Sequence, residues 1–150
     1  MLFRSKVPEP PVVTLSTSQL RRVQLLGGGT LRVSEIRGLE ADLSMSGNGE
    51  LTVDRADVER LVLYVGGGGR MTIAGSARDV RASINGPGAL DAARLDTRNA
   101  TVANDGVGSV HMRVSGAAKV VSTGSGDTIV EGNAICTVVR KGSGPVTCGN

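Results

Sequence analysis

The chain has very few aromatic side chains, since Phe3 and Tyr64 are the only two among 150 residues and tryptophan is absent. A globular core of this size normally contains several large rings. The interior is therefore expected to be built from aliphatic side chains. No apolar run approaches the roughly 20 residues that a membrane-spanning helix needs, so a transmembrane helix is not expected.

Concentrated positive charge is also missing. Lysine and arginine number 17 against 14 acidic residues, and the basic residues are scattered along the chain. Nucleic-acid binding needs a dense basic footprint, so it is not predicted. His111 is the only histidine, which leaves no histidine-based catalytic triad or metal cluster. No Gly-Lys-Ser/Thr phosphate loop occurs either, so no catalytic residue, metal site or cofactor is predicted.

Carboxylates are spread along the chain, and only Asp54, Asp57 and Glu59 are close in sequence. They share their segment with Arg55 and Arg60, which is typical of a solvated bend. Enzymes that cleave polysaccharides need clustered carboxylates for acid and base catalysis, and their sugars usually stack on aromatic rings. A polysaccharide-active enzyme is therefore the least favoured function.

Glycine is abundant, with 22 residues, and it recurs in Gly-x-Gly pairs spaced 18 to 20 residues apart. A fixed period of this length is the signature of a solenoid, in which each repeat forms one coil. We expect the pairs to form the corners of these coils, where positive φ or close packing between coils excludes a Cβ. The corner glycines are Gly27 and Gly29, Gly47 and Gly49, Gly67 and Gly69, Gly86 and Gly88, Gly106 and Gly108, Gly124 and Gly126, and Gly142 and Gly144.

Apolar residues alternate with polar ones on both sides of each corner. Around Gly67, for example, Leu61 and Leu63 precede the corner and Met71 and Ile73 follow it. Period-two alternation predicts strands with one buried face, here two strands of about five residues per repeat. Such short strands bury their apolar faces only by stacking on neighbouring repeats.

The predicted fold is an all-β, right-handed parallel β-helix of about seven coils of 18 to 20 residues, because parallel connections are nearly always right-handed. An antiparallel meander is the alternative. It is disfavoured because hairpins at both ends of the strands would give two classes of turn.

The position two residues before each corner changes character along the chain. It is apolar in the first four repeats and polar or charged in the last three, where an apolar residue stands one place earlier. This shift predicts a bulge or an altered corner that changes which residues face inward. The residues at this position are Leu25, Met45, Val65, Ile84, Asn104, Ser122 and Arg140.

The only cysteines, Cys136 and Cys148, both fall on the inward positions of the last repeat. A disulfide that clamps the final coil is the favoured interpretation, and it would contribute about 2 to 3 kcal/mol. Two buried free thiols remain the alternative. A disulfide would indicate an oxidising compartment.

Two regions are expected along the chain. Residues 1–13 contain Pro8, Pro10 and Pro11 and predict a disordered or extended lead-in, whereas residues 14–150 form a single β-solenoid domain. The lead-in has no apolar stretch typical of a signal peptide. Either the protein is cytoplasmic, or the sequence is a mature or truncated form.

The C-terminal segment 124–149 begins with Gly124-Ser125-Gly126-Asp127 and ends in the coil that carries the two cysteines. It resembles the head GIN domain family of bacterial auto-transporter adhesins, and the resemblance extends over residues 20–149. An aspartate directly after the corner, usual in that family, occurs here only at Asp127. The resemblance implies a β-helical head in the periplasm or on the cell surface, exported by a signal peptide that this sequence lacks. It implies no catalytic residues.

The favoured function is therefore a non-enzymatic β-solenoid of the bacterial envelope or surface, acting as an adhesin or a scaffold. Its expected partners are polysaccharide or protein surfaces, and its oligomeric state is left open. The alternative is a polymer-forming structural protein like the bactofilins, whose β-helices stack end to end. The clamped final coil, with Arg140 and Lys141 beside it, disfavours such growth.

Overall fold

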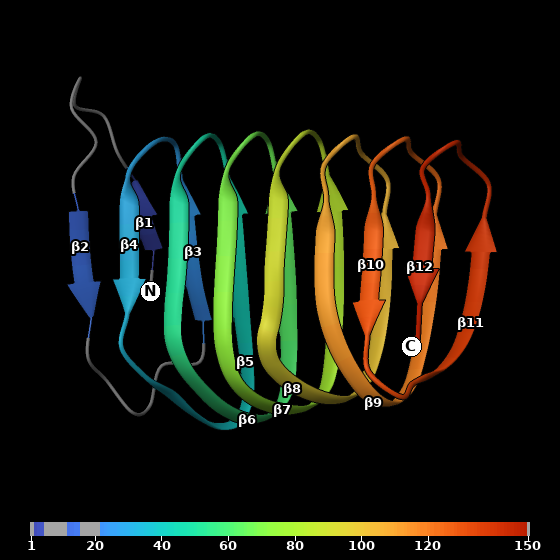
Figure 1. Ribbon diagram of the computed structural model, residues 1–150. Coiled ribbons are helices and arrows are strands. Elements are labelled where there is room, and N and C mark those ends of the chain that lie inside the picture. Colours follow the sequence, from blue (N-terminus) through green and yellow to red (C-terminus); the bar gives the residue numbers. More distant parts are fainter. Residues whose placement is uncertain (1, 5–11, 16–21, 150) are drawn as a thin grey trace.

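The computed structural model describes residues 2–4, 12–15 and 22–149, and this part of the chain forms strands and no helix. In Figure 1 the nearer strands run downward and the farther strands upward while the chain advances from left to right, which is a right-handed winding. The chain makes about six turns rather than seven, because the seven corners enclose six complete repeats. The predicted right-handed parallel β-solenoid is confirmed.

All strand pairs are parallel, as stacked coils require. The strands are β1 (Leu2–Arg4), β2 (Val12–Leu15), β3 (Arg22–Leu26), β4 (Thr30–Val33), β5 (Ile36–Ser46), β6 (Glu50–Gly66), β7 (Arg70–Asn85), β8 (Ala89–Asn104), β9 (Val110–Ser122), β10 (Thr128–Glu131), β11 (Ile135–Arg140) and β12 (Val146–Cys148).

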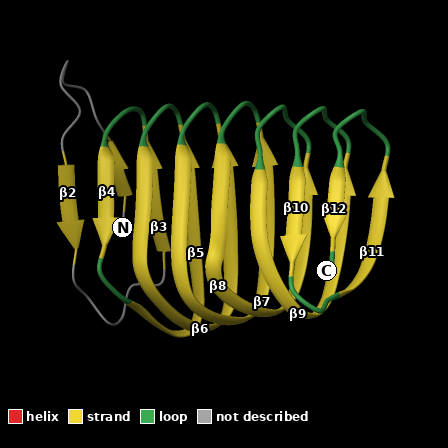
Figure 2. Ribbon diagram, viewed as in Figure 1, coloured by secondary structure: helices red, strands yellow, loops and turns green. Residues whose placement is uncertain are grey.

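The central strands are much longer than the five residues that the sequence predicts. Strands β6, β7 and β8 have 17, 16 and 16 residues, and each one follows a whole coil from one corner to the next. Figure 2 shows why: loops occupy the upper corners, whereas the strand continues through the lower bend. No proline interrupts the chain at this bend in the central coils, so it stays extended there.

Differences in repeat length are absorbed at the lower bend. The register between β7 and β8 shifts between Thr72 and Ala74, and the register between β8 and β9 shifts after Ala92. On the approach to the corners the pairing is uninterrupted, from Val80 paired with Ala100 onward. The strand segments that lead into the corners therefore form a regular sheet, called here the pre-corner face (residues 22–26, 40–46, 60–66, 79–85, 99–104, 117–122 and 135–140).

The core is a column of aliphatic side chains between the two sides of the coil. Leu43, Leu63, Ala82 and Val102 are buried one coil after another, and Met71 and Met112 face this row from the segments that follow the corners. No aromatic side chain takes part in this core among residues 22–149. The sequence prediction of an aliphatic interior is confirmed.

The corner glycines hold neighbouring coils in close contact. At Gly67 the backbone has a φ of 89° and an added Cβ would lie 2.7 Å from the carbonyl oxygen of Gly47. At Gly108 φ is not positive, but an added Cβ would lie 1.6 Å from the carbonyl oxygen of Gly88. Positive φ and close packing between coils therefore both require glycine. In the later corners, only the close packing does.

The corner changes in the later coils, but the same alternate positions of the strand still face the core. Asn104 and Ser122 are fully buried, and they continue the inward row of Ile84 without a register shift. The expected change of parity is therefore wrong. Polar side chains fill the interior instead, and the Asn104 amide donates to the carbonyl oxygen of Gly108 and to the hydroxyl of Thr128.

Both ends of the rod differ from its centre. At the first coils, β1 pairs with β3 and β2 pairs with β4, so two segments at the start of the chain join the solenoid. Residues 1 and 5–11 of the expected lead-in, and residues 16–21 of the expected solenoid domain, lie outside the described residues. At the last coil, a disulfide joins Cys136 of β11 to Cys148 of β12, and Ile135 of β11 is 79% exposed.

Candidate ligand-binding face

The outward residues of the pre-corner face lie in rows that cross the coils. One row contains Glu40, Arg60, Asp79 and Asn99, which are paired in register from β5 to β8. Two residues further along each strand, a second row contains Asp42, Val62, Arg81 and Thr101. Because side chains alternate across a strand, both rows point away from the core.

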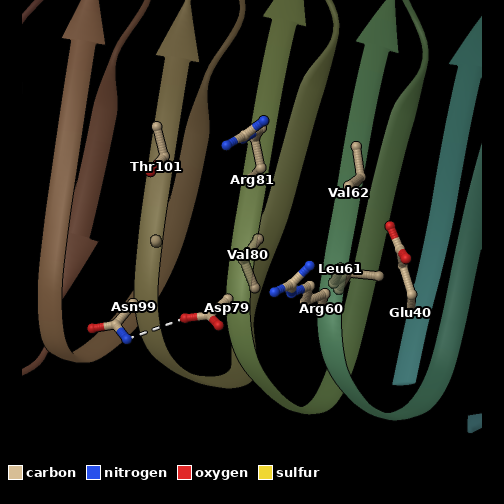
Figure 3. A pocket seen from close by; sticks show the side chains of 10 residues that line it. Glu40, Arg60, Leu61, Val62, Asp79, Val80, Arg81, Asn99 and Thr101 are labelled. Atoms are coloured by element: carbon tan, nitrogen blue, oxygen red, sulfur yellow. Dashed lines mark hydrogen bonds between the residues drawn. The ribbon is translucent and has the colours of Figure 1, made fainter. Parts of the chain in front are cut away.

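A shallow depression of about 480 Å³ lies over these two rows. Its polar lining comes from Glu40, Arg60, Asp79, Arg81, Asn99 and Thr101. Figure 3 shows these side chains rising from four neighbouring strands, with Val62 between Glu40 and Arg81 at the upper part of the depression. The depression is hollow enough to receive a group from a ligand.

The charges in this depression are largely free to act on a ligand. The Asn99 amide nitrogen donates to the Asp79 carboxylate at 3.1 Å (Figure 3). The Asn99 amide oxygen accepts from the backbone N–H of Ala117. Within the described part of the chain, neither Arg60 nor Arg81 forms an ion pair or a side-chain hydrogen bond. Two guanidinium groups are therefore left with all their donors available.

An aromatic ring lies beside the depression. Tyr64 follows Val62 on the outward side of β6 and is 37% exposed. Its ring lies over Gly66, where an added Cβ would be 2.9 Å from the ring carbon Cε1. The residues in register with it on β5 and β7 are Ser44 and Ser83. These side chains are small, so the neighbouring strands do not cover the ring.

The opposite side of the coil also carries paired side chains. Arg32 donates to the Asp54 carboxylate at 3.0 Å, and this hydrogen bond and the nearby negative charge raise the pKa of Arg32. His111 Nε2 lies 3.1 Å from a carboxylate oxygen of Glu131. These partners join neighbouring coils, as Arg22 and Asp42 do on the pre-corner face, where the two side chains lie 3.8 Å apart.

The carboxylates singled out in the sequence are not brought together. Asp54 pairs with Arg32, whereas Asp57 and Glu59 are exposed on the lower bend on either side of the buried Val58. Across the ranges 2–4, 12–15 and 22–149, no group of three His, Cys, Asp or Glu side chains is placed to hold a metal ion. No helix of the described residues is long and apolar enough to cross a membrane.

Sequence reasoning did not single out the depression. Arg60 was assigned to a solvated bend, and Tyr64 entered only as a rare aromatic residue. The signal was present at the odd positions before each corner, where Arg60, Arg81 and Tyr64 stand seven, five and three residues before their glycines. Aligned across the repeats, these outward positions place the three side chains on one face.

The similar solved structures include one described as a putative adhesin from Parabacteroides distasonis ATCC 8503. The two chains share 21% identity with a TM-score of 0.67, and the similarity covers 97% of this chain. The chain spans 59% of the length of that protein. At this identity the similarity establishes the fold. No curated protein matches the chain at a significant level.

A family model also matches residues 3–134, which is most of the chain and includes all strands that form the depression. Its description is putative auto-transporter adhesin, head GIN domain. The match agrees with the parallel coils and the glycine corners. The chain therefore belongs to the head GIN domain family of putative auto-transporter adhesins.

Proposed function

We propose that this protein is a non-enzymatic binding module of the bacterial envelope or cell surface, and that it adheres through its pre-corner face. The observation that carries the proposal is the depression with the unpaired Arg60 and Arg81 on an otherwise regular sheet. A rigid parallel sheet fixes the spacing of such groups, and fixed groups lose little entropy when a ligand binds. Membership of an adhesin family supports the same role.

The disulfide supports a location outside the cytoplasm. Disulfides persist in the periplasm and outside the cell, whereas cytosolic thiols are kept reduced. The Cys136–Cys148 bridge closes a short loop at the last coil. We expect thiol labelling of protein exported to a bacterial periplasm to detect no free cysteine before reduction and two after it. Free thiols in the exported protein would contradict this location.

Adhesion is tested by retention on surfaces. Fluorescently labelled protein is incubated with whole bacteria, outer-membrane vesicles and immobilised extracellular matrix, and the bound fraction is measured against protein concentration. We expect saturable retention on at least one surface, and competition by unlabelled protein. Retention that does not saturate, or that equals the retention of an unrelated protein of similar size and charge, would contradict adhesion.

A second candidate function is a polymer-forming structural protein like the bactofilins. One observation favours it: β11 pairs with β9 but has no partner on its other edge among the described strands, and Ile135, Val138 and Val139 of β11 are exposed. Open strand edges readily pair with further chains. Growth would require another coil to stack on the end of the rod that β11 and β12 form.

A further inference from the structure

We propose that the depression on the pre-corner face binds an acidic glycan, with Arg60 and Arg81 holding a sugar carboxylate and Tyr64 supporting a neighbouring sugar ring. This inference rests on the proposed binding function and assigns its ligand class. It follows from the three groups that the regular sheet places on one surface: two unpaired guanidinium groups, a row of carboxylate and amide groups, and an exposed ring.

The two arginines are spaced for a single anionic group. Arg60 pairs in register with Asp79, and Arg81 stands two residues further along the same neighbouring strand. From the spacing of parallel strands and the rise per residue, their Cα atoms are about 8 Å apart. Arginine side chains can converge on one carboxylate from this distance. Guanidinium groups bind carboxylates through two parallel N–H···O bonds, and neither arginine has a competing ion-pair partner among the described residues.

The remaining polar groups suit sugar hydroxyls. Glu40 and Asp79 present carboxylate oxygens that accept hydrogen bonds, and Asn99 and Thr101 complete the same two rows. A hydroxyl donates one hydrogen bond and accepts others, so a polyhydroxylated ligand can use these carboxylates as well as the arginines. A ligand that carried only negative charge would be repelled by Glu40 and Asp79. This mixture of groups favours an acidic sugar over a simple polyanion.

Tyr64 provides the apolar part of the site. It stands two residues beyond Val62 on β6, diagonally across from Arg81, because Arg81 pairs in register with Val62. The flat face of a sugar ring carries C–H groups that pack against an aromatic face, as apolar groups pack on rings in general. The ring lies over Gly66 and is framed by Ser44 and Ser83, so a chain of sugars can extend from the depression across it.

The test compares three polymers by biolayer interferometry: polygalacturonate, an acidic glycan; dextran, a neutral glycan; and poly-L-glutamate, an acidic polymer without sugar rings. We expect saturable binding of polygalacturonate, weakened by added salt because the charges are exposed. We expect binding of dextran and poly-L-glutamate to be about tenfold weaker or undetectable, since each lacks one class of contact. Equal binding of poly-L-glutamate would overturn the glycan assignment, and equal binding of dextran would overturn the role of the carboxylate.

Variants locate the site. The double change Arg60→Ala with Arg81→Ala should weaken polygalacturonate binding by about tenfold or more, because both carboxylate contacts are lost. Tyr64→Ala should weaken it roughly fivefold, whereas Tyr64→Phe keeps the ring and should restore most of the affinity. The matched control is Arg70→Ala, which removes an equally exposed arginine at the start of β7, outside the pre-corner face. Its affinity should stay within about twofold of the unmodified protein.

Exposed side chains are changed in each case, so the variants should fold, and circular dichroism checks that they do. An equal loss in Arg70→Ala would overturn the site, because binding would then follow net charge alone. The surface-retention assay separates the two proposals. Retention on cells without polygalacturonate binding overturns the glycan assignment and leaves adhesion standing, whereas the absence of both contradicts the binding function itself.

Discussion

At single residues, the tightest restraint is the contact between glycines of successive corners. An added Cβ at Gly126 would lie 1.9 Å from the carbonyl oxygen of Gly108, whereas nothing lies within 4 Å of an added Cβ at Gly28. We expect Gly126→Ala to lower the free energy of unfolding by at least about 2 kcal/mol, because the coils must separate to admit the methyl group. Gly28→Ala should be neutral or slightly stabilising.

Urea denaturation followed by circular dichroism measures this difference. The two variants make the same chemical change, so the comparison isolates the close contact from the general effect of replacing glycine. Equal midpoints for Gly126→Ala and the unmodified protein would show that neighbouring corners have room for the methyl group.

The buried polar residues of the later coils give a second contrast at the residue scale. Asn104 donates to Gly108 and Thr128 and accepts from the backbone N–H of Gly106, whereas the buried Ser122 hydroxyl has no hydrogen-bond partner among the described residues. We expect Asn104→Ala to cost about 2 to 3 kcal/mol, since it leaves several buried groups unpaired. Ser122→Ala should be neutral or stabilising, by up to about 1 kcal/mol.

Thermal unfolding of the two variants tests this contrast, and Ser125→Ala at the exposed middle position of the adjacent corner serves as a control for the same substitution. A loss of more than about 1 kcal/mol in Ser122→Ala would mean that the hydroxyl is hydrogen-bonded in solution, for instance to a buried water.

At the scale of elements, the last coil depends on its disulfide. Strand β11 pairs only with β9, and β12 pairs only with β10, so each lies at the edge of the rod. The bridge joins residues 12 apart in sequence, and closing such a loop contributes about 3 kcal/mol in the loop-entropy description. Reduction should therefore speed amide exchange in β11 and β12 and leave β7 and β8 unchanged, because coils interact only with their neighbours.

Hydrogen exchange with mass spectrometry, with and without reductant, makes this measurement. The double change Cys136→Ser with Cys148→Ser should reproduce the effect of the reductant, which controls for reduction of other components. Faster exchange throughout β7 and β8 would show that the rod unfolds as one unit, and would contradict the coil-by-coil description.

Element positions were predictable from the sequence where one physical rule acted alone. Period-two burial around Gly67 predicted the inward Leu63 and Met71 correctly, because only one face of a stacked strand reaches the core. The sequence did not predict the length of β6, which continues through the lower bend. No glycine or proline at this bend shows whether the chain there is extended or forms a loop. Asn104 was misassigned because polarity was taken to mean exposure, whereas its hydrogen bonds allow it to be buried.

The candidate site was less predictable than the fold, for a related reason. Inward apolar positions recur around each corner, so the pattern can be recognised by comparing the repeats. The outward residues differ from coil to coil, and Arg60, Val62 and Arg81 have no equivalents in most repeats. Only the register of the sheet shows that Arg81 stands beside Val62 and diagonally from Arg60. A site that combines residues of neighbouring coils therefore depends on the register between their strands, which the sequence alone does not give.

At the scale of the whole molecule, a solenoid has two ends on which further coils can stack. At the C-terminal end, the apolar side chains of β11 are exposed and would favour stacking. Arg140 opposes it. This residue continues the inward row of Asn104 and Ser122, so a further coil would bury its guanidinium group. An inward-pointing charge is a known means of protecting a sheet edge, and burying an unpaired charge costs several kcal/mol.

We therefore expect static light scattering of the protein to give a molar mass that stays constant as concentration rises, as a rod with a protected end requires. Arg140→Val removes the buried charge and should make the mass rise with concentration. Lys141→Val is the matched control, because it removes a positive charge from the next residue, which continues the outward row of Thr123. Filament growth by the unmodified protein would favour the bactofilin-like function over the capped rod. Equal association of both variants would assign the protection to net charge and not to the inward position of Arg140.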